Sequence, residues 1–346
     1  MNQTNFTSKE LEKIPIVMAC DDNYVVPTYI AIYSALLNHK SKSYYDFYIL
    51  CPENISREGT NFIKGLKDKF MSFSVKIVDM GTQFSDLKMK ISHISYPTFY
   101  RLCLPEVLSN YNKCIYLDSD TLVCEDLLSL YNTDLQGYSL AGVLSEGIIS
   151  DKIGARELCK RIGLPNVNTY INAGVLVMNL ERIRELDLMH KWLELSKMEF
   201  PAQDQDILNL SCFEDIKVLP LKYNSMTKYE VIGNKKVRNK RAKRVYSEEE
   251  IREANTKPVI IHYADRIKPW NDMNSFWADK WWSIVYSIDE KTSIDYINEF
   301  VLNNKAVKNS SIYKIKTKAV RFSQILGVYS FIKRIEDKFK HNARNI

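Results

Sequence analysis

Strand-like apolar runs alternate with segments of helical spacing along the first part of the chain. Five runs are apolar enough to predict buried strands: 14–20, 45–51, 73–79, 113–118 and 138–144. Between the early runs, residues 27–39 and 56–70 carry apolar side chains at helical intervals. Strands that alternate with helices predict an α/β fold, in which a Rossmann-like, mainly parallel sheet has helices on both faces.

The pattern continues past residue 150. Residues 170–180 resemble a strand, 181–197 form a strongly amphipathic helical segment, and 257–262 predict a short buried strand that ends in His262. Ligands of mainly parallel sheets bind beyond the carboxyl ends of the strands. The segments "ACDDNY" (19–24) and "LDSD" (117–120) both begin where an apolar run ends. We therefore expect them to meet at one edge of the sheet.

Charge is unevenly distributed. The net charge is +6, and residues 301–346 contain eleven Lys or Arg against two acidic residues. This asymmetry predicts a first domain at 1–290 and a basic, amphipathic, helical tail at 291–346, of which residues 305–346 are expected to meet an anionic membrane surface. A second basic cluster, 235–244, is interpreted as a solvated loop or helix face, and we expect no nucleic-acid partner.

The chain has the composition of a globular protein, with 45% apolar and 26% charged residues. The N-terminus does not have the pattern of a signal peptide, and no apolar run approaches the roughly 18–20 residues of a membrane span. Seven cysteines form no CxxC pair and are interpreted as free, mostly buried thiols in a reducing compartment. We expect a cytoplasmic protein, peripheral on the inner face of the cell membrane.

Asp118 and Asp120 follow the apolar run 113–117 and are one residue apart. In an extended segment alternate side chains point the same way, with Cα atoms about 6–7 Å apart. Two carboxylates held that close are unfavourable unless a cation lies between them. The pair therefore predicts a metal site.

Six motifs occur in an order that resembles the family 8 retaining glycosyltransferases: ACDDNY, TFYRL, YLDSD, NAGV, DQDILN and HYADRIKPW. This family includes glycogenin and bacterial galactosyl- and glucosyltransferases that extend lipo-oligosaccharide, and the resemblance spans about residues 14–285. It implies that residues 1–290 form a catalytic, nucleotide-sugar-binding domain with a fold of GT-A type. It also implies transfer of galactose or glucose from UDP-galactose or UDP-glucose to a glycan or lipid-linked oligosaccharide, with α linkage.

The resemblance further implies that Asp118, Asp120 and His262 bind the metal. Oxygen ligands with one imidazole suit Mn²⁺, and Mg²⁺ is the usual competitor. Lys268 is expected to neutralise the phosphates of the donor. The family pattern has a glycine where this chain has Asp265, a departure that bears on how closely the backbone approaches the phosphates.

For the nucleotide, the resemblance points to Ala19, Asp21, Asn23, Tyr24 and Ser119. Asp21 is expected to accept a hydrogen bond from the uracil N–H, Tyr24 to stack on the base, and Asn23 to bind a ribose hydroxyl. The alternative is that these polar residues only form a turn, for which Asp-Asp-Asn is typical composition.

Asn172, Asp204 and Gln205 are expected at the donor sugar, and Arg101 is expected at the donor sugar or phosphate. Retention of configuration needs either a nucleophile on the far face of the sugar or attack on the same face within an ion pair. Asp204 and Gln205 are the candidates to act as nucleophile or to stabilise the sugar cation, and both mechanisms stay open. Glu146 occupies the place of a sugar-contacting aspartate of the family.

Two other functions compete with this interpretation. The sequence "DSDTLV" is similar to the phosphatase box of haloacid-dehalogenase-type enzymes, although Thr121 follows Asp120 directly instead of after one intervening residue. A catalytically inactive sugar-nucleotide-binding protein is the other alternative, and an activity assay distinguishes it from an enzyme.

Overall fold

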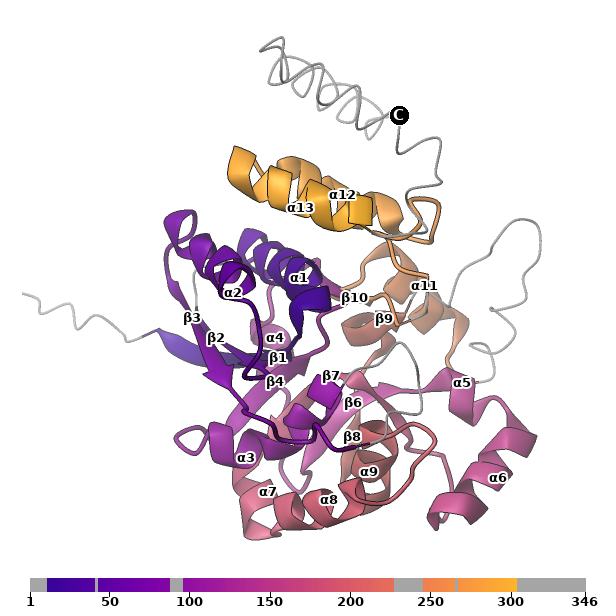
Figure 1. Cartoon of the computed structure of the whole chain (residues 1–346). Helices are drawn as coiled ribbons and strands as arrows, with labels where there is room; N and C mark the ends of the chain where they lie inside the picture. Colours follow the sequence, from indigo (N-terminus) through magenta and orange to yellow (C-terminus); the bar gives the residue numbers. More distant parts are fainter. Residues whose placement is uncertain (1–10, 41–42, 88–95, 227–244, 265–266, 304–346) are drawn as a thin grey trace, which may run out of the picture. The chain divides into compact units, whose positions relative to one another are not determined.

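The computed structural model describes residues 11–40, 43–87, 96–226, 245–264 and 267–303. They fall into two compact units, Met1–Arg266 and Ile267–Ile346 (Figure 1). The second unit begins at Ile267, before the domain boundary that we predict near residue 290. That residues 1–290 are catalytic and residues 291–346 form a membrane-binding tail stays a prediction. The predicted tail beyond residue 303 and the basic cluster 235–244 lie outside the described residues.

The first unit is built on a seven-stranded sheet. Its strands are β1 (Glu12–Ala19), β2 (Ser43–Cys51), β3 (Phe73–Asp79), β4 (Lys113–Leu117), β6 (Leu140–Leu144), β7 (Ile171–Asn179) and β8 (Ile216–Val218). The order is β3-β2-β1-β4-β7-β6-β8, and every neighbouring pair is parallel except for β7, which runs antiparallel to β4 and β6. The predicted α/β class with a mainly parallel sheet is confirmed.

Helices cover both faces of this sheet, as predicted (Figure 1). One face carries α1 (Val25–Leu37) and α2 (Arg57–Lys64), and the other carries α3 (Leu104–Val107), α7 (Leu180–Glu185), α8 (Leu188–Ser196) and α9 (Asp204–Ser211). Twelve of the thirteen residues of α1 are buried, which is why its sequence is apolar almost all round. Helix α2 begins where the Ser56 hydroxyl accepts the N–H of Gly59 at 3.0 Å.

The remaining elements are shorter or lie outside the main layers. They are the helices α4 (Leu128–Tyr131), α5 (Glu146–Ile149), α6 (Lys152–Ile162) and α11 (Glu248–Thr256), and the 3₁₀ helices η1 (Asp22–Tyr24), η2 (Gly65–Asp68), η3 (Tyr96–Cys103) and η4 (Leu221–Asn224). The second unit contains α12 (Ala278–Ser287) and α13 (Lys291–Asn303). None of the helices in the described ranges combines the length and apolarity that a bilayer span requires.

A second, three-stranded sheet has the order β5-β10-β9 and is formed by β5 (Thr121–Val123), β10 (Ile260–His262) and β9 (Ser225–Met226). Strand β10 runs antiparallel to β5, and His262 is the partner of Thr121. Because β5 begins directly after the two aspartates, this pairing brings a residue from far along the chain to their side.

Two local expectations differ from the structure. The amphipathic segment 181–197 is two helices, because Asp187 adopts left-handed backbone angles (φ 49°) between α7 and α8. Asp118 and Asp120 are not in an extended segment, since β4 ends at Leu117 and the aspartates occupy the turn before β5. All seven cysteines are free, five of them buried, which agrees with the interpretation as thiols.

Candidate active site

The turn between β4 and β5 holds the two aspartates beside His262. One ligand atom from each of Asp118, Asp120 and His262 lies within 4.8 Å of the others. His262 Nε2 is 3.2 Å from Asp120 Oδ1 and 3.7 Å from Asp118 Oδ2. The three residues that the sequence predicts as metal ligands are therefore brought together.

Hydrogen bonds from both sheets hold this turn. The Thr121 hydroxyl and N–H donate to the Asp118 carbonyl at 2.8 and 3.2 Å, and the Asp118 N–H donates to the carbonyl of Gly174 on β7 at 2.7 Å. The N–H of Tyr263, next to β10, donates to the Asp120 carbonyl at 2.9 Å. These hydrogen bonds fix the turn at both ends, so that the carboxylates of Asp118 and Asp120 lie on the same side. The predicted extended segment would have placed them on one side as well.

Gly174 leaves the space that the cluster needs. A Cβ atom at this position would lie 2.1 Å from His262 Cε1 and 2.7 Å from Asp118 Oδ2, closer than non-bonded atoms approach. Sequence reasoning assigned no role to this residue. The available signal was a glycine inside a buried strand, which often marks a close approach of other groups.

The three side chains suit a divalent cation. Two carboxylates and one imidazole are hard or borderline ligands, a set that Mn²⁺ and Mg²⁺ accept. The side chain of His262 is 3% exposed, while those of Asp120 and Asp118 are 12% and 28% exposed. An ion held here would thus be enclosed on the protein side and would keep positions open toward a ligand.

Arg101 joins the cluster to α9. This guanidinium is buried, donates to Asp118 Oδ1 at 2.8 Å, and forms an ion pair with Asp204 Oδ2 at 3.0 Å. It also donates to the carbonyl of Ala173 and lies over the ring of Tyr116 at 4.2 Å. Arg101 comes from the 3₁₀ helix η3, and both Asp118 and Asp204 balance its charge.

Asp204 begins α9 and is buried, with the Thr98 hydroxyl donating to its Oδ1 at 3.0 Å. Loss of hydration raises the pKa of this carboxyl from 3.8 to about 6, although Arg101 acts in the opposite direction and Asp118 adds to the rise. A buried carboxylate beside a second acid remains costly to ionise even with a cation as its neighbour.

This pKa predicts how the metal-free protein responds to pH. A carboxyl whose pKa is higher in the folded state binds its proton more tightly there, so stability falls as pH rises from about 4 to about 6. Asp204→Asn should remove this contribution. Urea unfolding of both proteins at several pH values checks it, because groups that do not interact with Asp204 cancel in the difference. A difference in unfolding free energy that does not vary with pH would contradict the assignment.

Gln205 and Asn172 face each other across α9 and β7. Gln205 Oε1 accepts from Asn172 Nδ2 and from the N–H of Ala173, each at 3.1 Å. The residue before Asp204, Gln203, has a positive φ of 54°, which is uncommon outside glycine and sets the direction in which α9 begins. The structure therefore brings together four residues predicted at the donor sugar: Arg101, Asn172, Asp204 and Gln205.

The segments 19–24 and 117–120 meet, as predicted. The Ser119 hydroxyl donates to the Ala19 carbonyl at 2.8 Å and accepts from the Thr28 hydroxyl at 2.8 Å. Asp21 accepts the N–H of Asn23 at 3.0 Å, the turn contact that the alternative interpretation expects. Ser119 is buried, and its hydroxyl connects the turn after β4 to the end of β1. Asn23 is exposed.

Tyr24 lies within electrostatic reach of the acidic pair. Burial raises the pKa of its hydroxyl most, and the charges of Asp120, Asp21 and Asp118 add to the rise. Glu146, the substitute for the family's aspartate, is buried at the start of α5. Lys268 belongs to the second unit, and its contact with the phosphates stays a prediction; Asp265 lies outside the described residues.

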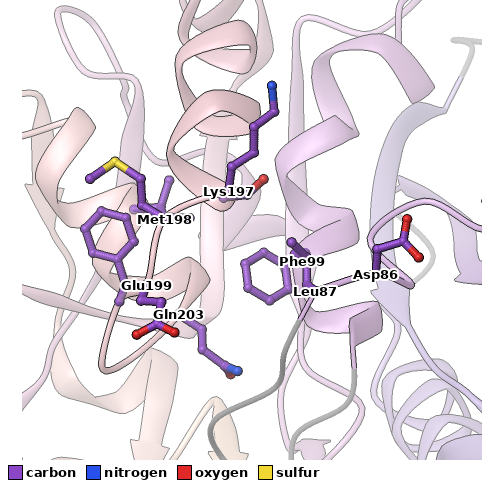
Figure 2. A pocket seen from close by; sticks show the side chains of 10 residues that line it. Asp86, Leu87, Phe99, Lys197, Met198, Glu199 and Gln203 are labelled. Carbon is purple, nitrogen blue, oxygen red and sulfur yellow. The ribbon is translucent and has the colours of Figure 1, made fainter.

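A cavity of about 270 Å³ lies between residues that precede α9 and residues of η3 (Figure 2). It contains none of the three proposed metal ligands, and its apolar wall includes Phe99 and Met198. Its lining is Asp86, Leu87, Phe99, Ser196, Lys197, Met198, Glu199, Phe200, Gln203 and Ile207. Sequence reasoning assigned no function to these side chains.

Known proteins resemble this chain in sequence. It is 28% identical over 340 residues to lipopolysaccharide 1,2-glucosyltransferase of Escherichia coli, an alignment that covers 94% of this chain and 91% of that protein. It is 27% identical over 271 residues to glycosyltransferase GlyF of Streptococcus pneumoniae serotype 4. That alignment covers 77% of this chain but only 60% of GlyF.

Solved structures resemble its fold. The galactosyltransferase LgtC in complex with donor and acceptor sugar analogs has a TM-score of 0.65 and 26% identity, over 80% of this chain and 97% of LgtC. The apo bifunctional glycosyltransferase WbbM has a TM-score of 0.70 and 23% identity, over 84% of this chain and 52% of WbbM. The fold is of GT-A type, as predicted. Residues 15–274 match the sequence profile of glycosyl transferase family 8, and the chain therefore belongs to that family.

Proposed function

We propose that the protein is a metal-dependent, retaining glycosyltransferase that moves galactose or glucose from a UDP-sugar to a glycan or lipid-linked oligosaccharide with α linkage. The observation that carries this proposal is the convergence of Asp118, Asp120 and His262 beside the Arg101–Asp204 ion pair, in a chain of this family. The similarity to a lipopolysaccharide glucosyltransferase over 94% of the chain supports an acceptor of the lipopolysaccharide class.

Asp118, Asp120 and His262 would hold Mn²⁺, with Mg²⁺ as the competitor. When bound, a divalent ion neutralises negative charge on a departing diphosphate. The two carboxylates would be ligands of that ion, and Gly174 leaves the space beside Asp118 and the imidazole of His262 clear. Lys268 is proposed to supply a second positive charge to the phosphates.

The nucleotide is proposed to lie along the end of β1. Ala19 and Ser119 would shape the floor of this site, because the Ser119 hydroxyl fastens the metal-binding turn to the Ala19 carbonyl. Asp21 would accept from the uracil N–H, Asn23 would reach the ribose, and Tyr24 would stack on the base. The charges that act on Tyr24 support its place next to the acidic pair.

Arg101, Asn172, Asp204 and Gln205 are proposed to surround the donor sugar. Both oxygens of Asp204 are engaged, Oδ1 by Thr98 and Oδ2 by Arg101, and the Gln205 oxygen already accepts two hydrogen bonds. A nucleophile must be free to approach the sugar carbon, whereas protein partners hold both oxygens of the buried Asp204 carboxylate, and this supports attack on the same face. Asp204 would then stabilise the positive charge that develops on the sugar.

The decisive experiment is an assay of UDP release. The purified full-length protein is incubated with Mn²⁺ and each of a panel of UDP-sugars, with and without lipopolysaccharide-type acceptors. Release of UDP with UDP-galactose or UDP-glucose, abolished by EDTA, is expected. Release of inorganic phosphate from phosphate esters instead would favour the phosphatase alternative. Donor binding without any release would favour the inactive sugar-nucleotide-binding protein.

We also propose that the basic tail places the enzyme on an anionic membrane surface. Each Lys or Arg near an anionic leaflet contributes on the order of 1 kcal/mol to binding. Truncation after Asn304 should release the protein from vesicles containing phosphatidylglycerol, with activity on a soluble acceptor largely retained. Co-sedimentation at low salt checks this. Full-length protein that stays in the supernatant would make the tail a packing element instead.

A further inference from the structure

Three amide side chains, those of Gln205, Asn172 and Asn224, connect α9 to His262, and we call them the amide relay. Asn224 is buried, and the other two are half-buried. Gln205 Oε1 accepts from Asn172 Nδ2 at 3.1 Å, and Asn172 Oδ1 accepts from Asn224 Nδ2 at 2.9 Å. Asn224 Oδ1 then lies 3.0 Å from His262 Nδ1. Asn224 is fully buried at the end of η4, and its side chain has no role in the function proposed above.

Two backbone N–H groups fix the direction of these amides. The N–H of Ala173 donates to Gln205 Oε1 at 3.1 Å, and the N–H of Gly174 donates to Asn172 Oδ1 at 3.0 Å. A backbone N–H can only donate, so an oxygen and not a nitrogen must face each of them. The oxygen of Asn172 therefore also faces Asn224, which must turn its nitrogen toward Asn172 and its oxygen toward the histidine.

The far end of the relay is fixed in the same direction. Gln205 Nε2 lies 3.2 Å from the Tyr170 hydroxyl, which donates its proton to Asp206 Oδ1 at 2.5 Å. Since that proton is committed to a carboxylate, the Tyr170 oxygen accepts from Gln205 and requires the nitrogen of the amide on that side. Both ends of Gln205 thus impose the same orientation.

The consequence falls on His262. An oxygen of Asn224 opposite Nδ1 requires the ring to carry its proton on Nδ1, which leaves a lone pair on Nε2 of the neutral ring. That lone pair faces Asp120 Oδ1 at 3.2 Å and Asp118 Oδ2 at 3.7 Å. Three acceptors directed at one another are unfavourable until a cation lies among them.

We propose that Asn224 is a positioning residue, which holds His262 through the amide relay as the tautomer with its proton on Nδ1 and with Nε2 as the metal ligand. This inference rests on the metal site of the proposed function. It also connects that site to Gln205 and Asn172, so that the residues at the proposed sugar position set the state of a metal ligand. Groups that orient a ligating histidine are ordinarily worth about 10–100-fold in metal affinity.

The test compares Asn224→Leu and Asn224→Asp with the wild type in two measurements. Long-range ¹H–¹⁵N NMR of the metal-free protein at alkaline pH reports the tautomer, and His262→Gln assigns the signal among five histidines. Calorimetry with MnCl₂ reports the affinity. We expect the proton on Nδ1 in the wild type and in Asn224→Asp, whose carboxylate still accepts it. In Asn224→Leu the proton should move to Nε2, and the Kd for Mn²⁺ should rise about 10–100-fold.

Asn209→Ala is the matched control. Asn209 is a buried asparagine that binds the N–H and the carbonyl of Ile171 at 2.7 and 2.9 Å and donates to the backbone carbonyl of Gln205 at 2.8 Å. None of these hydrogen bonds involves an amide side chain of the relay. Loss of the Asn209 side chain should lower thermal stability and leave the tautomer of His262 unchanged. A changed tautomer in this control would assign the effect to general loosening and overturn the proposal.

A wild-type proton on Nε2 would overturn the proposal even if Asn224→Leu does not fold. So would a folded Asn224→Leu with unchanged tautomer and unchanged affinity. Wild-type protein that binds no Mn²⁺ would overturn the metal site of the proposed function, and the NMR measurement would still decide whether the relay sets the tautomer.

Discussion

Replacing Asp118 with alanine is expected to lower sugar transfer by at least about 1,000-fold, because a bound metal supplies several kcal/mol of charge stabilisation and each 1.36 kcal/mol is a factor of ten. The fold should remain intact. Arg101 loses its partner at 2.8 Å but keeps Asp204 at 3.0 Å, so its buried charge is still paired. UDP release and the circular dichroism melting curve measure the two effects.

Asp120→Ala should behave in the same way, since it removes the oxygen nearest to His262 Nε2. Asp134→Ala serves as the control, because Asp134 is an exposed turn residue outside the cluster. Wild-type rates that persist in EDTA would refute the metal assignment. A large loss of melting temperature in both cluster variants would instead indicate that the carboxylates act on stability.

The second large effect is expected from one methyl group. Gly174→Ala places a Cβ atom 2.1 Å from His262 Cε1 and 2.7 Å from Asp118 Oδ2. Strand β7 pairs on both sides, so its backbone has little freedom to retreat. The histidine or the aspartate must therefore leave its place, and we expect loss of measurable Mn²⁺ binding and a decrease in transfer similar to that of Asp118→Ala.

Gly65→Ala is the matched control for this variant. Gly65 ends α2 with a negative φ of −61°, and no other group lies within 4 Å of an added Cβ. This substitution should leave Mn²⁺ binding and transfer unchanged and should not destabilise the fold. Calorimetry with MnCl₂ on both variants checks the comparison. If Gly174→Ala binds Mn²⁺ as tightly as the wild type, His262 and Asp118 can move away from the added Cβ without losing the ion, and the predicted role of Gly174 is wrong.

The periodicity of apolar residues was sufficient to predict the first strands of the sheet and the sheet edge at which the site lies. Alternating apolar runs predicted β1 to β4 closely, and the ends of these runs predicted that the segment after Ala19 meets Ser119. The antiparallel direction of β7 was not predicted, because a strand buried on both faces has the same pattern in either direction. The break at Asp187 was missed because the apolar spacing continues across it.

Partners of the charged side chains were beyond the reach of sequence patterns. Arg101 could be placed near the donor by family resemblance, but its pairing with both Asp118 and Asp204 depends on how η3 packs beside α9. The same holds for Asn224, whose sequence context resembles an ordinary helix end. Side-chain hydrogen bonds between distant segments arise only when the tertiary structure brings those segments together.

The pairing of β5 with β10 has a consequence for the order of folding. Strand β5 follows the turn that carries the two aspartates, and these precede His262, the last residue of β10, by more than 140 residues. The cluster of Asp118, Asp120 and His262 therefore exists only once β5 has paired with β10. Contacts of such high sequence separation form slowly, since loop closure must precede any gain from pairing. A cation that binds only the closed form stabilises it by mass action. Divalent metal should therefore slow the unfolding of the folded protein. Present during refolding, it should leave the early collapse of the parallel strands unaffected.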